Sequence, residues 1–91
     1  MHIVVETFRS VGESSASEIR VRPVVGQGFS PSVRVECSKS MRTAFPLGQK
    51  LLMDVQLKSR LGTPDWLYAN YRDAWQPLTA LEAREIILKR R

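Results

Sequence analysis

The stretch LLMDVQLK, residues 51–58, decides the fold class of this chain. Positions 51, 53, 55 and 57 carry apolar side chains, whereas positions 54, 56 and 58 carry polar ones. Side chains of a β-strand point alternately to opposite faces, so this pattern predicts a long strand with one buried face and one wet face. A strand of this kind is typical of an antiparallel sheet that is packed on one side only.

Two shorter segments upstream show the same alternation. Residues 18–25 and 32–37 each place valines or isoleucine on one side and charged side chains on the other, with Cys37 facing inward. The glycine- and proline-containing turn between them, residues 26–31, predicts that they form an antiparallel hairpin. Pro23 has no backbone N–H to donate, so we expect this strand to lie at an edge of the sheet or to end there.

The remaining strands are predicted from composition and turn signals. Residues 1–8 are rich in strand formers, and a flexible loop rich in serine and glycine follows at residues 9–17. Residues 38–48 are expected to be irregular. A turn at residues 59–65 folds the chain back on the long strand, so that residues 66–71 form the next strand.

A helix is predicted at the C-terminal end. Thr79 is a good N-cap, and Glu82 stands at the capping-box position three residues later. Apolar residues then recur at helical spacing. With five strands and this helix, we expect an α+β, mainly β fold: a single domain, residues 1–91, with a small antiparallel five-stranded bent sheet or partly open barrel, SH3-like or OB-like.

The composition argues against several classes of function. The 91 residues are 43% hydrophobic and 25% charged, as in ordinary globular domains. No apolar run reaches the roughly 18 residues of a membrane helix, and Glu6 comes too early for a signal peptide, so we expect a soluble cytoplasmic protein without membrane association. One cysteine and one histidine leave no internal disulfide, no metal site and no Ser-His-Asp arrangement. We therefore expect a protein without cofactor or metal that is not an enzyme.

A basic sheet face is the first candidate site. The formal net charge is +5, which favours polyanionic partners. Several cations on one surface are what a protein needs to contact the repeated phosphates of nucleic acid. In the alternative interpretation these cations are ordinary solvated residues, balanced in part by Glu18, Glu36 and Asp54. The candidate residues are Arg20, Arg22, Arg34, Lys39, Arg42, Lys58 and Arg60.

An aromatic cluster is the second candidate. The segment WLYANYRDAW, residues 66–75, holds four of the seven aromatic residues. Trp66 and Tyr68 share one side of the predicted strand and would form a stacking platform for bases. Tyr71 and Trp75 lie where the strand gives way to a loop and are the pair that we expect to be exposed as contact residues. The alternative is that two or three of these rings fill the core.

The leading functional prediction is a small non-enzymatic binding module for a polyanion, nucleic acid in particular, through the basic sheet face. A protein-interaction module or homodimer is the rival, based on an edge strand and the Tyr71/Trp75 patch. A small-ligand carrier with a pocket lined by Trp66, Tyr68 and Met53 is a third interpretation. Two features carry no chemistry: Cys37 is expected to be a buried structural thiol, and residues 26–28 form a turn without a phosphate-binding motif.

Overall fold

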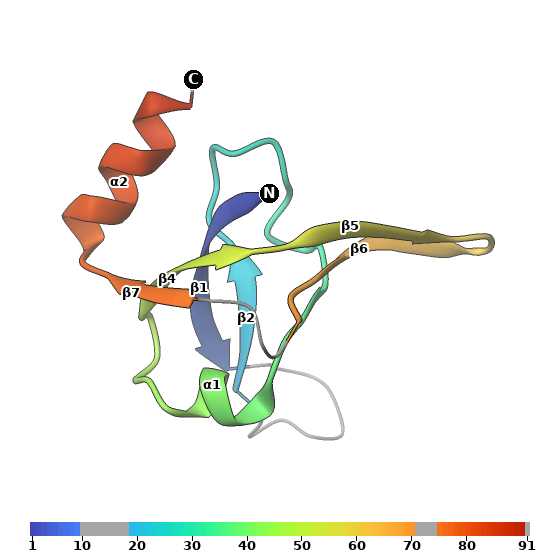
Figure 1. The fold of residues 1–91 in the computed structure, drawn as a ribbon, viewed down its shortest axis with the longest axis horizontal. Coiled ribbons are helices and arrows are strands. Elements are labelled where there is room, and N and C mark those ends of the chain that lie inside the picture. Colours follow the sequence, from blue (N-terminus) through green and yellow to red (C-terminus); the bar gives the residue numbers. More distant parts are fainter. Residues whose placement is uncertain (10–18, 71–74, 91) are drawn as a thin grey trace.

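The computed structural model describes residues 1–9, 19–70 and 75–90 of the chain, and within these ranges it contains seven strands and two helices (Figure 1). The elements in chain order are β1 (His2–Arg9), β2 (Ile19–Pro23), β3 (Val35–Glu36), α1 (Lys39–Thr43), β4 (Lys50–Asp54), β5 (Gln56–Arg60), β6 (Thr63–Tyr68), β7 (Trp75–Leu78) and α2 (Ala80–Lys89). The predicted loop at residues 9–17 falls almost wholly outside the described residues.

The strands form two sheets. The four-stranded sheet has the order β2-β1-β4-β7, and all its neighbours are antiparallel. The three-stranded sheet has the order β3-β6-β5, in which β5 and β6 are antiparallel and β3 runs parallel to β6. The mainly β character, the antiparallel pairing and the C-terminal helix are confirmed. Five strands in one bent sheet, and an SH3-like or OB-like barrel, are not confirmed, because the described strands are seven and form no closed barrel.

The predicted hairpin between residues 18–25 and 32–37 is wrong. β2 pairs with β1, whereas β3 belongs to the other sheet. The segment between β2 and β3 does not form a tight turn but contacts β1 through hydrogen bonds. The side chain of Gln27 accepts a hydrogen bond from the Val4 N–H at 2.7 Å and donates one to the Val4 carbonyl at 2.8 Å, as a neighbouring strand would. The Val4 carbonyl also accepts from the Val24 N–H at 3.0 Å, so the Gln27 side chain adds to the backbone pairing just beyond the end of β2.

The predicted long strand is divided at Val55 into two strands that follow one another directly but belong to different sheets. Its first half is β4 in the four-stranded sheet, and its second half is β5 in the three-stranded sheet. Val55 is buried, and its N–H donates to the Met1 carbonyl at 2.7 Å. The alternation holds through the junction, since Leu51, Met53 and Val55 all contribute to one core, whereas Leu57 is exposed.

Two cores lie on opposite faces of the four-stranded sheet. The main core joins the two sheets and α1, and its buried residues are Ile3, Val5, Val21, Val35, Met41, Leu51, Met53, Val55, Leu67 and Ala69. The second core lies under α2 and is made of Val4, Leu78, Ala83 and Ile87. Period-two alternation explains the division, because Val4 and Val5 are neighbours in β1 and point to opposite faces. Among the described helices none is long and apolar enough to span a bilayer.

The predicted ends of the elements are confirmed in two places. β2 is an edge strand and ends at Pro23. Thr79 caps α2 as predicted: its Oγ1 accepts from the Glu82 N–H at 3.1 Å, and the Glu82 carboxylate accepts from the Thr79 N–H at 2.9 Å. The short helix α1, which begins after the N-cap Ser38, and the strand β7 were not predicted.

Candidate functional site

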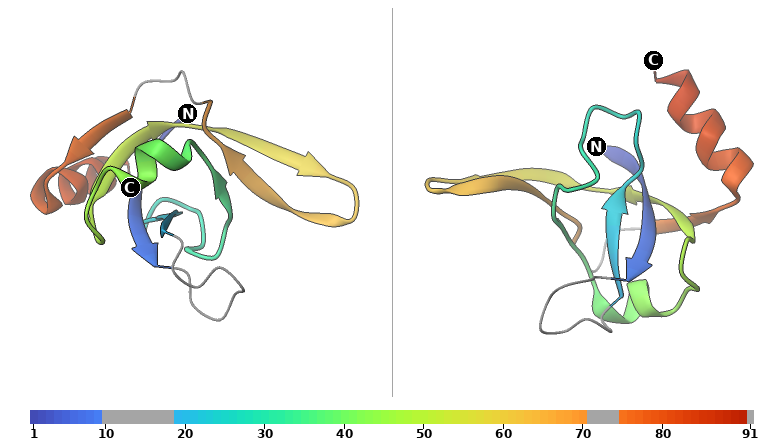
Figure 2. Two further views of the ribbon diagram at one scale, coloured as in Figure 1. Left: turned by 90° about the horizontal axis from the view of Figure 1, so that it is seen from below. Right: turned by 180° about the vertical axis from the view of Figure 1, so that it is seen from behind.

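The β5–β6 hairpin extends away from the two cores, at the opposite end of the molecule from α2 (Figures 1 and 2). All five residues of β5 are exposed. The turn of two residues contains Gly62, which has a φ of +86° and therefore adopts a conformation that other residues rarely reach. The Thr63 hydroxyl closes the turn by donating to the Arg60 carbonyl at 3.1 Å. The hairpin thus presents its side chains to solvent along most of its length.

Cations lie over aromatic rings on one face of this hairpin. Leu67 and Ala69 are buried, so alternation leaves Trp66 and Tyr68 half-buried on the other side of the strand. The Lys58 ammonium lies 5.8 Å from the centre of the Tyr68 ring, and the Arg60 guanidinium carbon lies 5.9 Å from that of Trp66. These distances lie just within the limit of about 6 Å for cation–π attraction, which favours the position of each cation over its ring.

Arg34 and Glu36 continue the same face on the other side of β6. Glu36 is opposite Tyr68 in the parallel β3–β6 pairing, and the pairing is held by Leu67 N–H, which donates to the Arg34 carbonyl at 2.9 Å. The Arg34 side chain is 70% exposed and forms an ion pair with Glu36 at 3.3 Å. We call this set the hairpin face; it consists of Arg34, Glu36, Lys58, Arg60, Trp66 and Tyr68. It carries three cations and one carboxylate.

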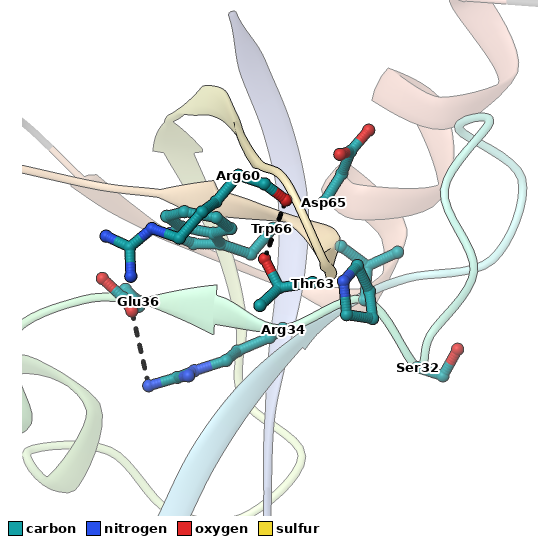
Figure 3. A pocket seen from close by; sticks show the side chains of 9 residues that line it. Ser32, Arg34, Glu36, Arg60, Thr63, Asp65 and Trp66 are labelled. Carbon is teal, nitrogen blue, oxygen red and sulfur yellow. Dashed lines mark hydrogen bonds and ion pairs between the residues drawn. The ribbon is translucent and has the colours of Figure 1, made fainter.

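A pocket of about 580 Å³ opens between the segment before β3 and the hairpin (Figure 3). The side chains of Arg34 and Arg60 both extend toward Glu36 from opposite sides (Figure 3). Trp66 contributes a buried Nε1–H that has no hydrogen-bond acceptor within the described part of the chain. The lining residues are Ser32, Val33, Arg34, Glu36, Arg60, Thr63, Pro64, Asp65 and Trp66. Met53, which was predicted to line a ligand pocket, is instead buried in the main core.

Arg20 and Arg22 lie on β2 in the other sheet, and the predicted face that would join them to Arg34 across a hairpin is not formed. Arg22 donates to Glu6 at 3.0 Å, and its guanidinium lies 4.7 Å from the Phe8 ring centre. Lys50 contacts the same carboxylate at 2.7 Å. Glu6 therefore offsets part of the positive charge on this sheet.

The electrostatics around Glu6 are those of a carboxylate between two cations. Burial by itself raises the pKa of Glu6. Hydrogen bonds and attraction from Lys50 and Arg22 outweigh the burial, so the pKa of Glu6 lies below its usual value of 4.5. Glu6 is ionised at neutral pH and ties β2 and β4 to β1.

Lys39 and Arg42 lie on α1 and form a third group of cations. Burial raises the pKa of the neighbouring Cys37 thiol, although Arg42 acts in the opposite direction. Cys37 packs against the main core, which confirms that it faces inward. A thiol with a raised pKa is a poor nucleophile at neutral pH.

Trp75 does not belong to the hairpin face. It lies on β7, at an edge of the four-stranded sheet, and its ring meets Phe45 edge to face with 5.2 Å between the ring centres. It is 39% exposed. Tyr71 lies outside the described residues, so the Tyr71/Trp75 patch stays a prediction.

No family model matches the chain, and neither a curated protein nor a solved structure is significantly similar to it. In the described ranges, no three His, Cys, Asp or Glu side chains come together as a metal site would require. Sequence reasoning identified Lys58, Arg60 and the Trp66/Tyr68 pair separately. The sequence does not indicate that Lys58 lies over Tyr68 and Arg60 over Trp66. Nor does it indicate that Glu36 lies beside Tyr68, because β3 and β6 are remote in the chain.

Proposed function

We propose that this chain is a small non-enzymatic module that binds a polyanion, nucleic acid in particular, through the hairpin face. The observation that carries the proposal is the superposition of Lys58 on Tyr68 and of Arg60 on Trp66. Cations that neutralise phosphates release condensed counterions, and aromatic rings stack on bases of any sequence. A surface that combines both groups is suited to nucleic acid more than to a simple acidic protein.

The proposal assigns a different weight to each group of cations. Arg34 and Arg60 line one pocket, and Lys58 lies on the hairpin beside it. The carboxylates at this pocket are those of Glu36, which pairs with Arg34, and Asp65. Arg20 and Arg22, on the other sheet, and Lys39 and Arg42, on α1, are assigned secondary contacts. For Arg22 the reason is its ion pair with Glu6, which weakens the field that it presents to a ligand.

The test is a titration of labelled single-stranded and duplex nucleic acid, followed by fluorescence anisotropy at several salt concentrations. We expect the logarithm of the affinity to fall with the logarithm of the salt concentration, with a slope of about −0.7 per phosphate contacted on a single strand. The double variant Lys58→Ala/Arg60→Ala should bind at least about 10-fold more weakly and show a shallower slope.

The matched control removes the same charge elsewhere. Arg84 and Lys89 are exposed on α2, at the opposite end of the molecule from the hairpin (Figure 1). Arg84→Ala/Lys89→Ala should change the affinity by less than about 3-fold, since charges beyond a Debye length of about 10 Å are screened. Equal losses in the two double variants would mean that the net charge alone governs binding, and absence of binding at low salt would reject the proposal.

A second function, interaction with a protein or with a second copy of the chain, is favoured by the edge strand β5. An edge strand offers unpaired backbone groups to another strand. Leu57 is 51% exposed and Leu61 is fully exposed at the hairpin turn. Light scattering at increasing concentration tests the homodimer: association that Leu57→Lys abolishes supports it, and a monomer at every concentration counts against it.

A further inference from the structure

We propose that the pocket beside the hairpin face receives one unstacked base of a single strand, so that the module prefers single-stranded nucleic acid to duplex. This inference rests on the proposed function and specifies its ligand. It follows from the size of the pocket, from the planar groups in its wall and from the spacing of the aromatic rings.

The pocket has the size of a small-ligand site. Its volume of about 580 Å³ lies within the roughly 300–1,000 Å³ of pockets that bind small molecules. The segment 32–36 forms one side and the hairpin residues 60–66 form the other (Figure 3). A base with part of its sugar can enter such a pocket, whereas a stacked base pair cannot.

The wall offers flat groups for stacking and cations for the adjoining phosphate. The guanidinium of Arg60 lies over the ring of Trp66, 5.9 Å from its centre, and a guanidinium plane is a group on which a base can stack. Arg34 is largely exposed at the pocket, where it is placed to contact a phosphate. The Thr63 hydroxyl supplies a polar group at the pocket.

The spacing of the rings excludes a regular stack of bases. Trp66 and Tyr68 are two residues apart on one strand, so their positions are separated by about 7 Å. Stacked nucleotides rise by only about 3.4 Å per step, and their faces are covered by their neighbours. Neighbouring bases can use both rings only when they are separated from each other, which a single strand permits and a duplex resists.

The experiment uses Trp66 as the reporter of its own pocket. The chain has two tryptophans, and Trp75→Phe leaves Trp66 as the only one. This variant is titrated with a thymidine oligonucleotide, with an abasic strand of the same length and with a duplex of that length. We expect the thymidine strand to quench Trp66 emission and to bind at least about 10-fold more tightly than the abasic strand and the duplex.

Two variants separate stacking from charge. Trp66→Leu should weaken binding of the thymidine strand roughly 5- to 150-fold and leave binding of the abasic strand unchanged. Arg60→Lys keeps the charge but removes the planar group, and it lies at an exposed position where the fold tolerates change. It should lose part of the preference for the thymidine strand over the abasic strand while the salt slope is kept.

The outcomes distinguish the two proposals. Salt-dependent binding with equal affinity for the thymidine and abasic strands, and with unchanged Trp66 emission, would overturn the base pocket and leave the polyanion module in place. Duplex bound as tightly as the single strand would overturn it as well. Absence of binding to all three ligands at low salt would overturn the proposed function itself.

Discussion

At the scale of single residues, Glu6 is the group whose environment has the clearest consequence for stability. Its carboxylate contacts Lys50 at 2.7 Å and Arg22 at 3.0 Å, from the strands on either side of β1. Hydrogen bonds to charged partners stabilise a fold more than neutral ones do. Glu6 of β1 therefore links β2 and β4 to the strand between them through two ion pairs.

We predict that Glu6→Gln lowers the free energy of unfolding by about 1–2 kcal/mol at neutral pH. Because the pKa of Glu6 is lowered in the folded state, the stabilisation is fully present above its usual value of 4.5. It is lost as the pH falls through the lower folded value. Urea unfolding of the wild type and of Glu6→Gln between pH 7 and pH 3 measures how the difference in their free energies of unfolding depends on pH.

The control for Glu6 is Glu85→Gln, which removes a carboxylate from an exposed position on α2. It should change the stability by less than about 0.5 kcal/mol at any of these pH values. A difference between wild type and Glu6→Gln that does not shrink in acid would show that the ionised carboxylate is not the stabilising form.

At the scale of elements, the capping box is a feature that local sequence determines. We predict that Thr79→Ala destabilises the protein by about 1 kcal/mol, because the Glu82 N–H loses its acceptor. Thr43→Ala is the comparison, since the Thr43 hydroxyl only donates to carbonyls within α1. Chemical denaturation should show a smaller loss for Thr43→Ala, and equal losses would contradict a capping role.

The features that the sequence predicts correctly are, like the capping box, determined by residues close together in the chain. The Thr79/Glu82 spacing, the reversal of the chain within residues 59–65 and the edge position of Pro23 each depend on a few neighbouring residues. The reversal itself takes only residues 61–62, because β5 extends to Arg60 and β6 begins at Thr63, earlier than the predicted start at residue 66. Pairing between strands that are distant in the chain does not depend on neighbouring residues alone. Nothing in residues 32–37 indicates that this segment pairs with β6 instead of β2, because β3 and β6 are remote in the chain and alternation does not identify a strand's partner.

The division of the long strand was unpredictable for a related reason. Alternation reports which side chains are buried, and Val55 continues the buried positions without a break. It does not report which neighbour each half pairs with. The same limit applies to the candidate site: the fold-back of β6 on β5 was predicted, but the contribution of Arg34 and Glu36 required the parallel pairing of β3 with β6.

At the scale of the whole molecule, β1 belongs to both cores. Val5 packs in the main core between the sheets, and Val4 packs in the second core under α2. Since both side chains are fully buried on one strand, loosening either core disturbs the strand that the other core needs. We therefore expect the protein to unfold in one cooperative transition, as small domains generally do.

The prediction is that Val4→Ala and Val5→Ala each lower the stability by about 2 kcal/mol, through lost burial and the cavity left behind. Each variant should keep a single transition.

In the Trp75→Phe background, Trp66 emission reports the three-stranded sheet, and far-UV circular dichroism reports α2 together with the strands. The two signals should give coincident urea curves in both variants. Loss of the helical signal in Val4→Ala at urea concentrations where Trp66 emission is still native would mean that α2 and its core unfold independently, and that β1 does not couple the two halves.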